Sequence, residues 1–195
     1  MTAGDLPQER EAQVDVLFDG YVGDRVAGTV SVIRDGSRII VVDPGMVPDR
    51  RSILDPLESL GIRSGDVTDV VFSHHHPDHT LHAALFEEAS FHDHWAIYRN
   101  DTWTSRPAEG FAVSPSVRLW ATPGHTPQDI TTLAATPDGI VAFTHLWWFE
   151  AGPPEDPLAV DPPSIHSGRA RVMEVANLIV PGHGPAFSPS GTTPA

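Results

Sequence analysis

A short apolar run of this chain leads directly into a cluster of metal-ligating side chains. VTDVVF is followed by SHHHPDHT, which places four such side chains within six residues: His74, His76, Asp78 and His79. Residues two apart in extended backbone point the same way, so the rings of His74 and His76 share a direction. Pro77 favours extended backbone before it and a helix start after it. Nitrogen and oxygen donors in this order predict a site for one or two divalent cations.

Two later segments place single histidines in similar turns. WATPGHTPQD carries His125 after an expected strand, and LIVPGHGPAF carries His183 after another. The glycines beside these histidines allow close backbone approach and let the ring swing inward. The alternative for the first cluster is a histidine-rich loop at a helix cap, and the two Gly-His turns make that alternative weaker.

The amino-acid composition excludes several kinds of site and partner. The chain has no cysteine, which excludes a disulfide scaffold, a thiolate zinc site and a cysteine nucleophile. Its formal charge is −14 and all twelve basic residues are arginine. This charge argues against a nucleic-acid partner and favours a small-molecule substrate.

Short β-branched runs separated by turns make up most of the remaining chain. We expect strands at 14–18, 29–34, 38–42, 67–72, 117–121, 130–134, 140–143 and 178–180. Helices are expected at 50–60, 78–89 and 167–176. Residues 152–163 contain five prolines and predict a stiff loop.

These elements predict one domain over residues 13–187, with a loose arm at 1–12 and a disordered tail at 188–195. The first residues lack a secretory pattern, and no window has the apolar run of a membrane helix. We therefore expect a cytoplasmic protein with no membrane partner. Its assembly state is open, and a homodimer is one alternative.

The HxHxDH pattern, the two distant Gly-His turns and VVDPG near the start resemble the metallo-β-lactamase superfamily over residues 13–187. The resemblance implies an α/β fold, a four-layer αββα sandwich with a metal site at one edge between the sheets. It also implies two ion sites, the first formed by His74, His76 and His125 and the second by Asp78, His79 and His183. Asp43 of VVDPG would orient a ligand, or it simply caps a turn.

One position departs from the family pattern. Superfamily members usually place an aspartate that bridges both ions after the strand that here ends in IVAF, and this chain reads AFTHLWWFE. The matching residue is His145, unless the alignment slips by one and places Leu146 there. An imidazole cannot bridge two ions about 3.5–4 Å apart as a carboxylate does. The second ion should then bind more weakly, or recruit Glu150 or a substrate carboxylate.

The sequence gives weaker indications of where the other aromatic and histidine side chains lie. Trp147, Trp148 and Phe149 form either a core or dimer patch or an apolar pocket wall. His92 and His94 repeat the HxH spacing but lack the following Asp-His, so we expect exposed rings in a strand or loop. His82 is expected on a helix surface, and His166 at a helix start with a capping or solvent role.

Taken with the resemblance, the donor set predicts a metal-dependent hydrolase that uses one or two zinc ions, with iron or manganese as alternatives. A metal-bound hydroxide would attack an ester, lactone or thioester, and less readily a phosphodiester. Asp78 would be the catalytic carboxylate, holding the nucleophile and moving a proton. Two alternatives stay open: a metal- or ligand-binding protein without turnover, and an RNA endonuclease such as the superfamily also contains.

Overall fold

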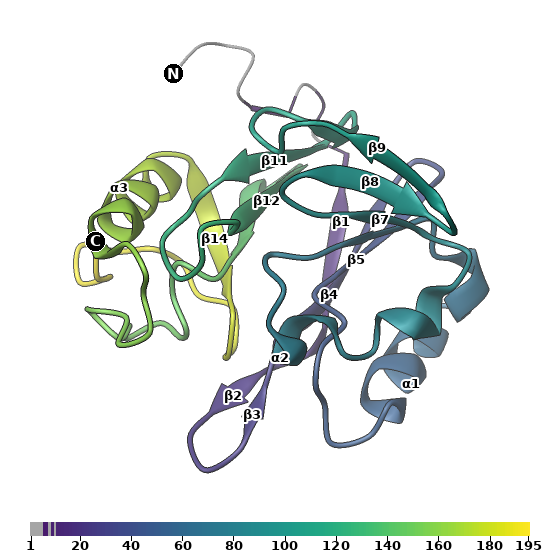
Figure 1. Cartoon of the computed structure of the whole chain (residues 1–195), viewed down its shortest axis with the longest axis horizontal. Coiled ribbons are helices and arrows are strands. Elements are labelled where there is room, and N and C mark those ends of the chain that lie inside the picture. The colour runs from purple at the N-terminus through teal and green to yellow at the C-terminus, as the bar shows by residue number, and fades with distance from the viewer. Residues whose placement is uncertain (1–5, 8, 10) are drawn as a thin grey trace.

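The computed structural model describes residues 6, 7, 9 and 11–195, and two facing β-sheets dominate it (Figure 1). The larger sheet comprises, in spatial order, β1 (Gln13–Phe18), β4 (Val30–Asp35), β5 (Arg38–Val42), β6 (Asp69–Val71), β7 (Ser90–His92), β8 (Ala96–Arg99) and β9 (Thr102–Ser105). β5, β6 and β7 run parallel, and the other neighbours are antiparallel.

The smaller sheet comprises β10 (Ala112–Ser114), β11 (Val117–Ala121), β12 (Ile130–Thr136), β13 (Gly139–Thr144) and β14 (Ala176–Pro181). β13 and β14 are parallel, and the other pairs are antiparallel. A separate hairpin of β2 (Tyr21–Val22) and β3 (Val26–Ala27) projects from the body of the molecule (Figure 1).

Helices cover the outer faces of both sheets. α1 (Arg51–Ser59) buries Ile53 and Leu57 against the larger sheet, and α3 (Pro162–Met173) buries Ile165 and Val172 against the smaller one. The short elements are α2 (Pro77–Thr80), η1 (Ser64–Asp66) and η2 (Ala83–Phe86), the last two being 3₁₀ turns. None of the described helices has the length and apolar character needed to span a membrane.

The central strands of the larger sheet are buried on both faces because their side chains alternate between two cores. In β5, Ile40 and Val42 face the smaller sheet, whereas Val41 faces α1. In β6, Val71 likewise faces the smaller sheet and Val70 faces α1. Strands buried on both faces have nearly continuous apolar sequences, as here. The layers are therefore helix, sheet, sheet and helix, which confirms the expected αββα sandwich.

The expected helix at 78–89 is wrong in extent. α2 stops at Thr80, η2 forms a separate turn, and β7 follows at once. His82 interrupts the helix because its N–H donates to the Pro44 carbonyl and its Nδ1 bonds to the Gly45 carbonyl at 2.7 Å. His82 is thus a partly buried contact between segments, where the sequence suggested a helix surface.

α3 begins earlier than expected, inside the proline-rich segment. The Asp161 carboxylate accepts from the Ser164 N–H at 3.2 Å, and Pro162 and Pro163 occupy the first turn, where proline is tolerated. The helix ends at Met173. The strands β2, β3, β8, β9 and β10 were not expected from the sequence, and β7 lies where a strand or loop was expected.

The two ends of the chain contact the sheets and α3 where they are described. The Ala12 N–H donates to the Ala135 carbonyl at 3.1 Å, while residues 1–5, 8 and 10 of the expected arm lie outside the described residues. In the C-terminal segment, where the sequence predicts disorder, the Pro194 carbonyl accepts from Trp147 Nε1 at 2.7 Å. The Ala195 carbonyl contacts His166 Nδ1, and His166 itself is exposed.

Candidate metal centre

The carboxyl ends of strands from both sheets meet at one edge of the sandwich, and the expected ligands lie there. His74 and His76 follow β6, and His125 follows β11. His76 Nδ1 lies 3.0 Å from His74 Nε2 and 3.1 Å from His125 Nε2. The structure thus brings together the three histidines expected to form the first ion site, each offering a nitrogen within 4.8 Å of the other two.

A second group of donors lies beside the first and joins α2 to the end of β14. Asp78 Oδ2 lies 3.4 Å from His79 Nε2 and 3.5 Å from His183 Nε2. α2 reaches this position by close backbone packing, since the Asp78 carbonyl accepts from the N–H groups of Gly28 and Met46. A Cβ at Gly45 would lie 1.7 Å from that carbonyl oxygen, which explains the glycine of VVDPG.

Buried hydrogen-bond acceptors contact the Nδ1 atoms of three of these histidine rings, on the side away from the other donors. Asp43 Oδ2 lies 3.0 Å from His79 Nδ1, and Asp156 Oδ2 lies 2.8 Å from His125 Nδ1. The Ala27 carbonyl is 3.0 Å from His183 Nδ1. With Nδ1 occupied, each Nε2 faces the centre, which is the usual arrangement of metal-ligating histidines. Asp43 also accepts from the Ser73 N–H and hydroxyl, so it fixes the loop as well as the ring.

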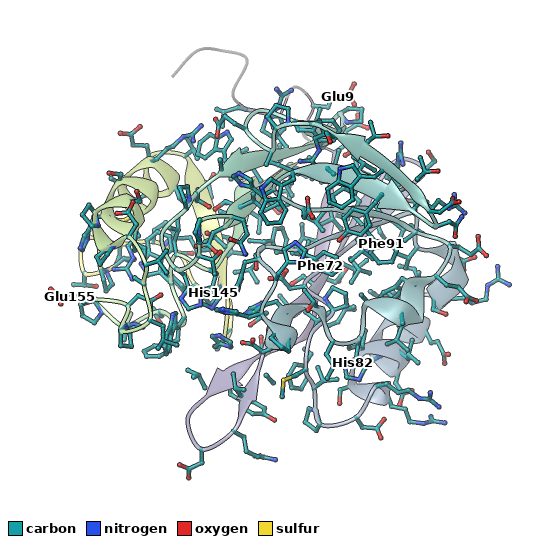
Figure 2. The ribbon with its side chains drawn as sticks, in the orientation of Figure 1. Glu9, Phe72, His82, Phe91, His145 and Glu155 are labelled. Atoms are coloured by element: carbon teal, nitrogen blue, oxygen red, sulfur yellow. The ribbon has the colours of Figure 1, made fainter. Side chains whose placement is uncertain are left out.

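His145 lies between the two groups of donors. Its ring centroid is within 4.3–5.1 Å of those of four other histidines: His74, His79, His125 and His183. Figure 2 shows it at the junction of the two halves of the molecule. Leu146 instead packs in the apolar core beneath α3. The structure therefore brings His145, and not Leu146, to the cluster.

The electrostatics of the cluster follow from burial and from its few carboxylates. Burial and the neighbouring imidazoles hold the pKa values of His74 and His145 well below their ordinary value, so both rings are neutral. Burial opposes charge on His79 as well, but Asp43 and Asp78 outweigh it and raise the pKa of His79 to about 9. Of the described residues, neither His79 Nε2 nor His145 Nδ1 has a hydrogen-bond partner. Buried, converging and partly unpaired nitrogens fit divalent metal ions that prefer nitrogen and oxygen ligands.

A cavity of about 140 Å³ opens onto these donors. Its apolar walls are Val22 and Val26 of the β2–β3 hairpin, together with Trp148 and Leu158. Trp148 is thus the pocket-wall member of the aromatic run, whereas Trp147 is buried in the core beneath α3. Phe149 lies at the surface, 36% exposed.

Some residues have places that the sequence did not indicate. Asp156, in the proline-rich segment, holds His125 and also accepts from Trp148 Nε1 at 3.1 Å. No local pattern identifies it. Glu150, the suggested substitute ligand, is exposed and lines a different hollow. The expectation of an exposed His92 is wrong, because His92 is 3% exposed and bonds to Asp69.

The sandwich and the cluster at its edge together define an αββα protein with a candidate metal centre. The sequence profile of the metallo-beta-lactamase superfamily matches residues 23–190, and the chain belongs to that superfamily. It is 32% identical over 188 residues to metallo-beta-lactamase domain-containing protein 1 of Xenopus laevis, covering 89% of this chain and 80% of that protein. The human protein of that name is 36% identical over 158 residues, 76% of this chain and 59% of the human protein.

Solved structures show the same fold at lower sequence identity. A Thermotoga maritima protein classed with the metallo-beta-lactamases superposes with a TM-score of 0.75 and 21% identity, covering 92% of this chain and all of that one. TTHA1623, solved in a di-iron-bound form, superposes with a TM-score of 0.65 and 18% sequence identity, covering 88% of this chain and 94% of that one. A variant of B. thuringiensis AiiA with N-decanoyl-L-homoserine at its active site superposes with a TM-score of 0.64 and 16% sequence identity. The match covers 89% of this chain and 93% of that one.

Proposed function

We propose that this chain hydrolyses a small ester, lactone or thioester with the help of one or two divalent metal ions. The observation that carries the proposal is the convergence of six histidines and one carboxylate on one edge of the sandwich. Asp43, Asp156 and the Ala27 carbonyl hold the Nδ1 atoms of three of these rings. A divalent ion bound there would lower the pKa of water toward 7 and polarise a carbonyl oxygen.

Each donor has a proposed place. His74, His76 and His125 would hold one ion, and Asp78, His79 and His183 the other. His145 would contribute a single nitrogen to one of them, because an imidazole has only one free lone pair. Zinc suits this set of nitrogen and oxygen donors, and iron or manganese are the alternatives, iron being the metal of the similar di-iron structure.

Asp78 is the residue proposed to move a proton. Partial burial opposes its ionisation, but the interaction with His79, whose Nε2 lies 3.4 Å from Asp78 Oδ2, outweighs burial and lowers the pKa of Asp78 to about 2. It is therefore ionised at neutral pH and able to accept a proton from a water molecule beside it. Its carboxylate lies in the lining of the cavity, where a substrate would enter.

The cavity walls support a neutral carbonyl substrate. Two valines, a tryptophan and a leucine surround the donors, and none of the described residues that line the cavity is an arginine. A phosphodiester would be better served by fixed cationic groups. N-decanoyl-L-homoserine in the active site of AiiA supports an acyl substrate with an apolar chain.

The test is a turnover assay on protein loaded separately with zinc, iron and manganese. The panel contains an aryl ester, an acyl lactone, an acyl thioester and a phosphodiester. Asp78→Asn serves as the control that retains the cavity walls. We expect turnover of at least one carbonyl substrate and loss of that turnover in the variant. Bound metal with no turnover on any substrate would favour a non-catalytic binding protein. Phosphodiester cleavage alone would favour a nuclease.

A further inference from the structure

The edge of the larger sheet far from β1 is formed by β9, and this strand is fully exposed. Figure 1 places β9 at the outer margin of the molecule. All four residues, Thr102–Ser105, are exposed, and within the described residues β8 is the only strand paired with it. An open edge presents unpaired backbone N–H and C=O groups that pair readily with another strand.

The sequence of β9, although short, lacks the charged and proline residues that often protect an edge. TWTS contains no charge, no proline and no glycine, whereas β1 at the opposite edge carries Asp15 in an ion pair with Arg34. Trp103 is 57% exposed. The flanking charges balance locally, because Arg99 pairs with Glu88 at 2.9 Å, and Asp101 and Arg106 carry one charge of each sign. The strong overall negative charge is therefore not concentrated at this edge.

An aromatic ladder crosses the outer face of the sheet and ends on this strand. The register places Phe91, Tyr98 and Trp103 opposite one another on β7, β8 and β9. Their rings stack with centroid separations of 5.7 Å and 5.3 Å and interplanar angles of 15° and 9°. Figure 2 labels Phe91, the member of this ladder on β7. The ladder has no further partner beyond Trp103 in the described part of the chain.

The backbone pattern fixes which groups of β9 are free. The Arg106 N–H donates to the Trp95 carbonyl, so the alternation of an antiparallel pair turns the backbone groups of Thr104 and Thr102 toward β8. Those of Trp103 and Ser105 then point outward. Directly opposed residues of an antiparallel pair share a face. Two copies of β9 related by a two-fold axis perpendicular to the sheet therefore keep both tryptophans on the same face.

We propose that two copies of this chain associate through antiparallel pairing of β9 with β9. With Thr104 nearest the axis, Trp103 of each copy pairs with Ser105 of the other, and the two Trp103 rings become diagonal neighbours on one face of the dimer, within reach of one another. The contact is self-complementary, as a two-fold interface requires. Four residues from each copy make a small interface, so the dimer should be in reversible equilibrium with the monomer.

Sedimentation velocity over a range of protein concentrations tests the proposal. We expect the wild type to shift from monomer to dimer as concentration rises, and Trp103→Lys to remain monomeric over that range. Val16→Lys is the matched control, since Val16 is an exposed apolar residue on β1 at the opposite edge, and it should dimerise like the wild type. Circular dichroism verifies that both variants fold.

The absence of native cysteine provides a second readout. Thr104→Cys places one thiol in each copy close to the axis, where opposed residues are near enough for a disulfide. We expect oxidation to give a covalent dimer for this variant and none for Val16→Cys. A wild type that stays monomeric, a dimer insensitive to Trp103→Lys, or a dimer without the Thr104 cross-link would each overturn the proposal.

Discussion

The Nε2 atoms of His145 and His183 lie 3.1 Å apart. These residues follow β13 and β14, parallel neighbours whose register pairs Thr144 with Pro181. The two strand ends therefore project both rings into the same small volume. A carboxylate at position 145 would offer one oxygen to each of two ions, whereas an imidazole serves only one. We infer that the two ion sites have unequal affinity.

His183→Ala should lower the number of metal ions bound per chain while the fold is retained. The side chain supplies one of the second group of donors, and its loss leaves Asp78 and His79 with no third partner from β14. Elemental analysis of metal content and circular dichroism provide the measurement. His166→Ala is the control, because His166 is exposed and its Nδ1 bonds to the Ala195 carbonyl, away from the centre. Equal metal content in the two variants would contradict the assignment.

Asp156→Asn should weaken metal binding by about 10–100-fold, the usual effect of losing a carboxylate that orients a ligating histidine. The residue acts on the position of the His125 ring and is a positioning residue in this account. Competition with a fluorescent chelator measures the affinity. The neighbouring Glu155→Gln removes a similar charge from an exposed side chain and should leave the affinity unchanged. Similar effects of both substitutions would indicate a general charge effect.

Gly182→Ala should disturb the centre through His145. A Cβ at position 182 would lie 2.4 Å from His145 Cδ2, and the ring, 3% exposed, has little room to move. We expect reduced metal content, and we expect the effect to disappear in a His145→Ala background because the clash is then absent. Gly65→Ala, where a Cβ would meet no atom within 4 Å, is the control. An equal loss of metal with and without His145 would show that the clash is not the cause.

The layers and most donors of the candidate site follow from the sequence because they depend on local patterns. Runs such as those of β5 and β6 are apolar at successive positions, which indicates strands covered on both faces. The HxHxDH spacing and the two Gly-His turns place ligands at strand ends without knowledge of the tertiary fold. His145 was indicated only through the family resemblance.

Other features depend on contacts between distant segments. Asp156 contacts His125 from 31 positions away in the sequence, and no local pattern in its loop indicates that contact. The expected helix at 78–89 fails because His82 bonds to the Gly45 carbonyl, a tertiary contact that outweighs helical spacing. The strand β8 and the edge strand β9 are short and carry polar residues, so their periodicity is weak.

Stepwise removal of metal by a mild chelator tests the inequality of the two sites most directly, with metal per chain measured in wild type, His145→Asp and His145→Ala. We expect the wild type to lose one ion well before the other. His145→Asp should hold the weaker ion longer, because it restores a negative charge and a second oxygen. His145→Ala should lose that ion sooner if the imidazole is its ligand. Two ions lost together in the wild type, with no change in either variant, would contradict the account.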